Sequence, residues 1–130
     1  MALFVDTASR EPIYLQIVQQ VREQIARGEL RPDERLPSVR QLSQELVVNP
    51  NTIARAYTEL EREGTLVSRA GLGIFVGHPR NDLTKAARGR RLRDQLDRLL
   101  TEAVHLDFSA LEVERLFKER LAQFQWNRDH

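Results

Sequence analysis

The stretch of sequence that decides the fold covers residues 38–76 and reads SVRQLSQELVVNPNTIARAYTELEREGTLVSRAGLGIFV. It opens on Ser38, and Gln41 follows three residues later, which is the capping-box pattern of a helix start. Apolar residues then recur at helical spacing, so a short helix is expected over 38–46. Residues 47–50 read VVNP, and their asparagine and proline predict a tight turn.

A second helix and a hairpin are expected after this turn. Asn49 is a favoured helix cap and Pro50 suits a first helical position, so the second helix is expected over 51–63. Short apolar runs at 66–68 and 74–76 enclose a loop that contains glycines, and they predict the two strands of a hairpin. Two short helices joined by a tight turn and followed by a hairpin form a winged helix-turn-helix, which fits the major groove of DNA. The predicted fold class is therefore mainly α with a small β-hairpin.

One face of the second helix is polar. Four of its side chains stand at positions i, i+4, i+7 and i+11: Asn51, Arg55, Thr58 and Arg62. In the major groove arginine hydrogen-bonds guanine and asparagine hydrogen-bonds adenine, so we expect this face, with Thr52 beside it, to contact DNA. The alternative for Arg55 is a surface ion pair with Glu59 one turn later. Tyr57 is expected in the core, with a phosphate contact by its hydroxyl as a further hypothesis.

The sequence on either side of this stretch predicts further helices. Apolar residues at helical spacing predict one helix over 12–27. We expect three regions in all: an N-terminal arm at 1–9, a winged helix-turn-helix DNA-binding domain at 10–79, and a helical dimerisation tail at 80–130.

The tail is expected to form two helices, over 83–104 and from 109 to about 125. Ser109 and Glu112 give the second helix a capping box. Two helices cannot close a core by themselves, so their apolar stripes must pack against the first domain or against a second copy of the chain. A second copy is the preferred interpretation. The candidate dimerisation residues are Leu92, Leu96, Leu99, Leu100, Ala103, Leu116, Phe117 and Leu121.

Charge is distributed unevenly, although the net charge is only +1. Residues 46–58 and 64–80 contain arginines and no acidic side chain, which makes the expected DNA-contacting surface locally positive. Residues 80–98 carry seven basic and three acidic side chains. An ordinary solvated face is the first interpretation of this basic region, and a phosphate contact by the start of the tail helix is the alternative.

Several classes of protein are disfavoured by the composition. The 130 residues include no cysteine, so neither a disulfide framework nor a zinc–cysteine site is expected. No apolar run approaches the ~20 residues that span a bilayer, and the N-terminus lacks the pattern of a signal peptide, so we expect a cytoplasmic protein without a membrane partner. The three histidines are widely separated, and no nucleophile–base pair or phosphate loop is visible. We expect no catalytic residue, no metal site and no cofactor.

The region 11–77 resembles the GntR family of bacterial transcription regulators. The resemblance rests on motifs that are weak singly but specific in this order: PIYLQI at 12–17, GELRP at 28–32, LPSVRQL at 36–42, VNPNTIARAY at 48–57, LEREG at 60–64 and GLGIFV at 71–76. The short tail looks like that of the YtrA subfamily, whose members carry only a two-helix dimerisation unit.

The resemblance implies DNA-contacting residues position by position. Arg40 matches the family's arginine near the start of the first helix of the helix-turn-helix. Gly71 matches the wing-tip glycine that lets the backbone enter the minor groove. The polar residues that open the family's recognition helix match Asn49, Asn51 and Thr52. The full set of candidate DNA-binding residues is Ser38, Arg40, Asn49, Asn51, Thr52, Arg55, Thr58, Arg69 and Gly71.

These features together predict a sequence-specific DNA-binding transcription regulator. We expect a homodimer that binds a palindromic operator in double-stranded DNA and acts as a repressor. Resemblance to the YtrA subfamily suggests control of a transporter operon. The alternative is a winged-helix protein-interaction module that does not bind DNA. The sequence indicates neither the operator sequence nor a small-molecule effector.

Overall fold

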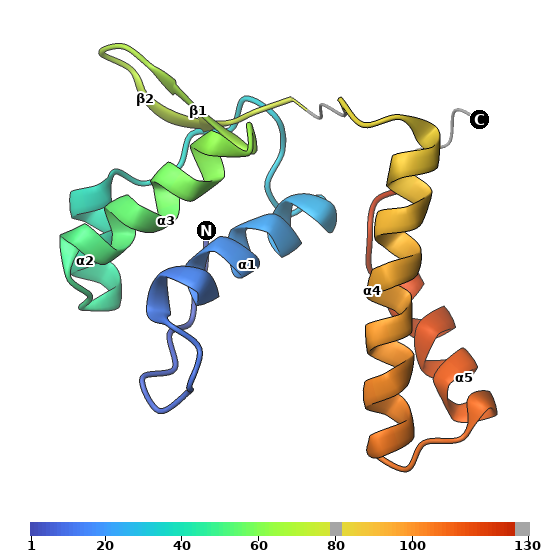
Figure 1. Cartoon of the computed structure of the whole chain (residues 1–130). Coiled ribbons are helices and arrows are strands. Elements are labelled where there is room, and N and C mark those ends of the chain that lie inside the picture. Colours follow the sequence, from blue (N-terminus) through green and yellow to red (C-terminus); the bar gives the residue numbers. More distant parts are fainter. Residues whose placement is uncertain (79–81, 127–130) are drawn as a thin grey trace. The chain divides into compact units, whose positions relative to one another are not determined.

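The computed structural model describes residues 1–78 and 82–126 (Figure 1). The chain divides into two compact units, residues 1–80 together with 125–130, and residues 81–124. The expected boundary between residues 79 and 80 lies outside the described residues.

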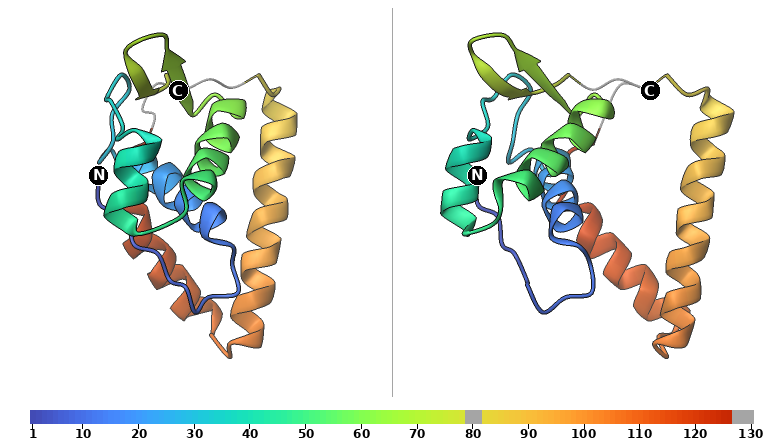
Figure 2. Two further views of the ribbon diagram at one scale, coloured as in Figure 1. Left: turned by 90° about the vertical axis from the view of Figure 1, so that its left-hand side faces the viewer. Right: turned by 60° about the vertical axis from the view of Figure 1, so that its left-hand side comes forward.

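The described part of the first unit consists of three helices and a two-stranded antiparallel sheet, as the winged helix-turn-helix prediction requires. These elements are α1 (Ile13–Ala26), α2 (Val39–Leu46), α3 (Pro50–Arg62), β1 (Leu66–Arg69) and β2 (Gly73–Val76). Both views in Figure 2 show the hairpin projecting beyond the helices. Helix α3 packs against α1, α2 and β1, so it is the central element of the unit.

The core of this unit draws on every element. Its largest fully buried side chains are Tyr57, Ile17, Leu42, Ile53, Leu60, Leu66, Val21 and Val76. Helices α1 and α3 contribute apolar residues at helical spacing, and each strand of the hairpin contributes one terminal residue. The apolar face of α3 is thereby fixed, and its polar face is turned outward.

Local capping explains where the two helices of the helix-turn-helix begin. The hydroxyl of Ser38 accepts a hydrogen bond from the Gln41 amide at 3.1 Å, and the Gln41 side chain accepts one from the Ser38 amide at 2.9 Å. This confirms the predicted capping box. The side chain of Asn49 accepts a hydrogen bond from the Asn51 amide at 2.8 Å and caps α3, as predicted.

Residues in the expected N-terminal arm lie along α1. The Phe4 amide donates to the side-chain oxygen of Gln20 at 2.9 Å, and the Asp6 amide donates to that of Gln16, also at 2.9 Å. Leu3 is partly buried against the core. Residues 1–9 therefore have specific contacts with the winged helix-turn-helix unit.

The second unit holds two helices in its described residues, α4 (Lys85–His105) and α5 (Ala110–Leu121). Figure 2 shows them as a V that opens away from their connecting turn. Helix α4 starts later than the expected residue 83, because Thr84 is its cap and accepts a hydrogen bond from the Ala87 amide at 3.1 Å. Ser109 and Glu112 form the predicted capping box of α5. This helix ends at Leu121 rather than near 125.

Candidate nucleic-acid interface

The outward face of α3 carries the predicted polar row. Asn51, Arg55, Thr58 and Arg62 are exposed, whereas Ile53 and Leu60 on the other side of the helix are fully buried. Thr52, at the edge of this row, is half-buried. The exposed row presents amide, guanidinium and hydroxyl donors, the groups that read base edges and phosphates.

Arg55 is held by a residue of α1 that the sequence did not point to. Its guanidinium carbon lies 3.8 Å from the centroid of the Tyr14 ring, and its Nη2 donates to the Tyr14 hydroxyl at 3.2 Å. The alternative expectation, an ion pair between Arg55 and Glu59, is wrong. Arg62 takes that partner instead, with its Nη1 2.7 Å from Oε1 of Glu59.

Two further candidates lie at the start of α2. Ser38 is exposed, and its hydroxyl is used in the capping box. Arg40 is also exposed, and its side chain makes no hydrogen bond or ion pair with the described part of the chain. Its guanidinium is therefore available to an external anion such as a phosphate group.

Tyr57 does not direct its hydroxyl toward solvent, so the hypothesis of a phosphate contact is wrong. The residue is 2% exposed, and its hydroxyl donates to the carbonyl of Pro37 at 2.8 Å. Burial, with a smaller effect from the charge of Glu45, raises the pKa of this hydroxyl well above its usual value. Tyr57 thus joins α3 to the segment that leads into α2, and it positions the two helices relative to each other.

The hairpin forms the predicted wing. Leu66 pairs with Val76 and Arg69 pairs with Gly73, so each strand is one residue longer than expected and the loop is correspondingly short. Gly71 lies in this loop with φ +74°, in the left-handed region that favours glycine. No other atom lies within 4 Å of the position that a side chain would occupy there. The tip of the wing is therefore open to an approaching surface.

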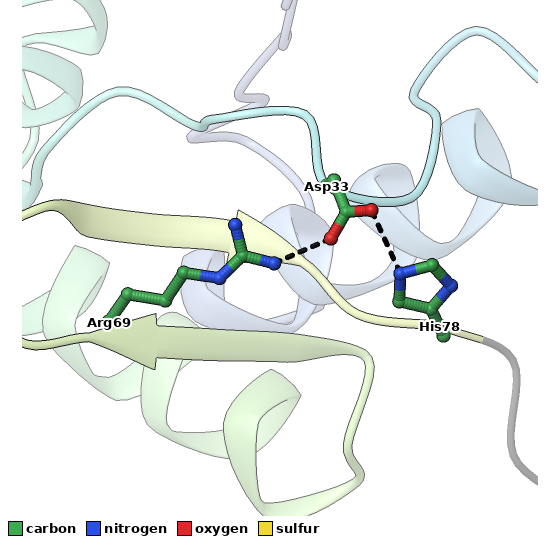
Figure 3. Close-up of polar contacts among 3 residues, drawn as sticks. All are labelled: Asp33, Arg69 and His78. Carbon is green, nitrogen blue, oxygen red and sulfur yellow. Dashed lines mark hydrogen bonds and ion pairs between the residues drawn. The ribbon is translucent and has the colours of Figure 1, made fainter.

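Arg69, the wing arginine expected to contact DNA, has partners within the protein. Its Nη2 lies 2.5 Å from Oδ1 of Asp33, and its guanidinium carbon lies 4.4 Å from the centroid of the Phe75 ring. The other carboxylate oxygen of Asp33 lies 2.9 Å from Nε2 of His78, as Figure 3 shows. Asp33 therefore links β1 to the segment that follows β2.

Asp33 belongs to a loop that is attached to the wing by its backbone as well. The Asp33 amide donates to the Val76 carbonyl at 2.8 Å, and the Val76 amide donates to the Glu34 carbonyl at 2.8 Å. Hydrogen bonds from Arg69 and then from His78 hold the pKa of the Asp33 carboxyl below its usual value. The sequence carried no sign of this role, because the partners of Asp33, Arg69 and His78, lie 36 and 45 positions away along the chain.

The described residues form neither a cluster of metal-ligating side chains nor a membrane-spanning helix. They contain no group of three or more histidine, cysteine or acidic side chains that could hold a metal ion. No helix among them is long and apolar enough to cross a bilayer. What the site presents is a set of hydrogen-bond donors and cations on a rigid helix, beside a hairpin with an open tip, which suits binding rather than bond-breaking chemistry.

The candidate dimerisation residues lie on helices that lack a core of their own. Neither α4 nor α5 has a buried residue in the described chain. Two of the candidates, Leu96 and Ala103, are half-buried. The other six are exposed: Leu92, Leu99, Leu100, Leu116, Phe117 and Leu121. An apolar groove lies between the two helices, lined among others by Leu99, Phe108 and Phe117. Apolar area of this extent needs another surface to cover it.

The sequence of this chain is similar to those of known bacterial regulatory proteins. Residues 13–76 match the family described as bacterial regulatory proteins, gntR family. The HTH-type transcriptional repressor YtrA of Bacillus subtilis (strain 168) is 35% identical over 112 residues, which are 86% of this chain and 84% of that protein.

Two solved structures show the same fold. A structure described as a transcriptional antiterminator from Listeria monocytogenes EGD-e is 29% identical and superposes with a TM-score of 0.80, covering 100% of this chain and 98% of that one. AraR(DBD) in complex with operator ORX1 is 32% identical with a TM-score of 0.51, covering 58% of this chain and 93% of that one.

Proposed function

The chain belongs to the GntR family of bacterial regulatory proteins and is a DNA-binding transcription regulator, not an enzyme, and we propose that it is a repressor that binds a palindromic operator as a homodimer. The observation that carries the proposal is the exposed polar face of α3, fixed by a fully buried apolar face on the other side. The similar protein YtrA is described as a repressor, and AraR(DBD) was solved with an operator.

In this mechanism α3 enters the major groove and the wing approaches the adjacent minor groove. Asn51, Arg55 and Thr58 read base edges or phosphates from the exposed face, with Thr52 at its edge. Arg40 and the capping residues Ser38 and Asn49 anchor the phosphate backbone at the entrance to the groove. Gly71 lets the wing backbone approach closely. Arg69 holds the wing through Asp33, and its guanidinium remains partly exposed for a phosphate.

The homodimer forms through α4 and α5 in this proposal. Their uncovered apolar faces support it, because a second copy of the same V supplies an equally apolar surface. A twofold dimer presents two copies of α3 to DNA, which implies half-sites about one helical turn apart on one face of the duplex. Binding across a promoter excludes RNA polymerase. The regulated genes form a transporter operon in this proposal, and the protein acts in the cytoplasm, where the promoter is.

Footprinting tests the proposal directly. The purified protein is titrated onto a duplex that carries its own upstream region, with an unrelated duplex of equal length as the control. Protection of an inverted repeat is the expected result. A cleavage pattern without protection at every protein concentration of the titration would overturn the proposal and favour the protein-interaction module.

The dimer is tested separately by light scattering on eluted protein. Leu99→Glu places a charge on the apolar face of α4 and is expected to give monomers that lose footprint protection. Thr101→Glu, which adds the same charge at an exposed polar position of the same helix, is the matched control and is expected to stay dimeric. A wild-type protein that elutes as a monomer would contradict the homodimer.

A further inference from the structure

The start of α4 carries a dense basic segment that the mechanism above does not use. Residues 85–93 contain five cationic side chains and no acidic one. All five are exposed, and Figure 1 shows this segment as the yellow part of α4. The basic segment consists of Lys85, Arg88, Arg90, Arg91 and Arg93.

No carboxylate in the described part of the chain forms an ion pair with these cations. Asp94 lies one turn after Arg90 and Asp97 one turn after Arg93, which is the spacing of helical ion pairs. Neither pair forms, and no nitrogen of the basic segment lies within 4.0 Å of a carboxylate oxygen among the described residues. In the first unit, by contrast, Arg62 and Arg69 each have a carboxylate partner.

The position of the basic segment in its helix is also unfavourable for an isolated chain. The N-terminal end of a helix carries partial positive charge, so cations there are repelled and acids are preferred. The first turn of α4 contains no acidic residue. Like charges along the same turns add further repulsion. An external polyanion relieves both effects at once.

Chain connectivity limits the distance by which the basic segment can be separated from the wing. Strand β2 ends at Val76, and six residues, 79–84, separate His78 from Lys85. The seven Cα-to-Cα steps from His78 to Lys85 span at most about 25 Å when the chain is fully extended. Duplex DNA carries about one negative charge for each 1.7 Å of its axis, so a duplex bound by α3 and the wing presents many phosphates within this reach.

We propose that the basic segment at residues 85–93 contacts the phosphate backbone of the same DNA duplex, beside the half-site bound by α3. The inference rests on the proposed DNA binding and extends it to a second surface that adds affinity without sequence preference. Arg88 and Arg91, one turn apart on one side of α4, are the central members of this surface.

The test is the salt dependence of DNA binding. The double variant Arg88→Gln/Arg91→Gln removes two charges and keeps good helix formers at both positions. The double variant Arg115→Gln/Lys118→Gln removes two exposed charges from α5 and is the matched control. Dissociation constants for the operator duplex and for a random duplex are measured over a series of KCl concentrations, with the oligomeric state checked by light scattering.

Because the proposed homodimer carries two basic segments, the double substitution removes four phosphate contacts, and the slope of log K against log salt is expected to fall by about 3.6, at about 0.9 for each contact. Affinity for operator and random DNA should fall by the same factor, so their ratio stays constant, and the control should keep the wild-type slope. An unchanged slope in the Arg88/Arg91 variant, with wild-type protein still protecting its operator, overturns this inference alone. If that variant becomes monomeric, the inference is also overturned. The result would mean that the basic segment of the wild-type protein pairs with acidic side chains of a second copy instead of with DNA. Failure of wild-type protein to bind any duplex refutes the proposed function itself.

Discussion

The guanidinium carbon of Arg55 lies over the ring of Tyr14, 3.8 Å from its centroid, and the guanidinium also donates a hydrogen bond to the Tyr14 hydroxyl at 3.2 Å. The two residues are 41 positions apart in the chain. Helix α1 thus supports the central cation of the exposed face of α3. A side chain whose rotamer is already restricted loses less conformational entropy when it binds a ligand.

Arg55→Ala is expected to weaken binding to the operator by about 1–3 kcal/mol, the usual contribution of a good arginine–base contact. Binding to random DNA should change much less, because phosphate contacts elsewhere remain. Gel-shift titrations on both duplexes measure the two effects. Equal affinities of wild type and variant for the operator would remove Arg55 from the set of DNA contacts.

Tyr14 should act on DNA only through Arg55. Tyr14→Phe keeps the ring under the guanidinium and loses the hydrogen bond, whereas Tyr14→Leu loses both. We therefore expect operator affinity to fall in the order wild type, Tyr14→Phe, Tyr14→Leu, with the larger loss of about 0.5–1 kcal/mol for an exposed cation–π contact. In a double-mutant cycle the Tyr14 substitutions should have no effect once Arg55 is alanine. A full effect in that background would mean that Tyr14 acts independently.

The Asp33 carboxyl should titrate below its usual value of 3.8, because Arg69 and then His78 stabilise its charged form. The stabilisation is therefore complete above the unfolded-state pKa, and it is lost as the pH falls through the lower pKa of the folded state. Carbon-13 NMR of the side-chain carboxyl measures this directly. Arg69→Gln should raise the pKa more than His78→Gln does, since the Arg69 hydrogen bond is the larger cause. Identical titration curves in all three proteins would contradict the role of Asp33 as the link between β1 and the segment that follows β2.

Features that depend on neighbouring residues could be read from the sequence. The capping box at Ser38 and Gln41, and the cap at Asn49, are set by spacings of two or three residues, and both formed as predicted. The polar face of α3 follows from helical periodicity in the same way. Fold class and element order followed from these local patterns together, with helix and strand ends displaced by only a few residues.

Contacts between distant segments could not be read from the sequence. Asp33 and Arg69 are 36 positions apart, and nothing near Arg69 indicates that its partner lies in the loop before α2. The local rule pointed Arg55 toward Glu59, yet its guanidinium lies over the ring of Tyr14 on a neighbouring helix. Tyr57 illustrates the same limit, because a helical pattern predicts burial of the ring but not the carbonyl that its hydroxyl meets.

Tyr57→Phe should lower the free energy of unfolding by about 0.5–1.5 kcal/mol, the net contribution of a typical hydrogen bond. The ring keeps its packing, and the loss comes from the Pro37 carbonyl that no longer has this donor. Urea unfolding at a fixed protein concentration measures the change, with the midpoint lowered and the slope unchanged. Tyr14→Phe, at a less buried tyrosine, is the control and should have the smaller effect. The reverse order would show that the Pro37 contact does not stabilise the fold.

Val47 should be a site where substitution increases stability. It ends α2 with φ +53° and ψ +51°, a left-handed conformation that is unfavourable for a β-branched residue, and its side chain is 90% exposed. The left-handed conformation costs an L-residue about 1–2 kcal/mol, and glycine avoids this cost but loses about 0.5–1 kcal/mol through the greater freedom of its unfolded chain. Val47→Gly is therefore expected to raise the free energy of unfolding by up to about 1.5 kcal/mol in urea titrations. Val47→Ala removes the branched side chain and keeps the Cβ atom, so it should stabilise less than glycine. Greater stability of the alanine variant would show that branching, rather than the left-handed backbone, is the source of strain at this turn.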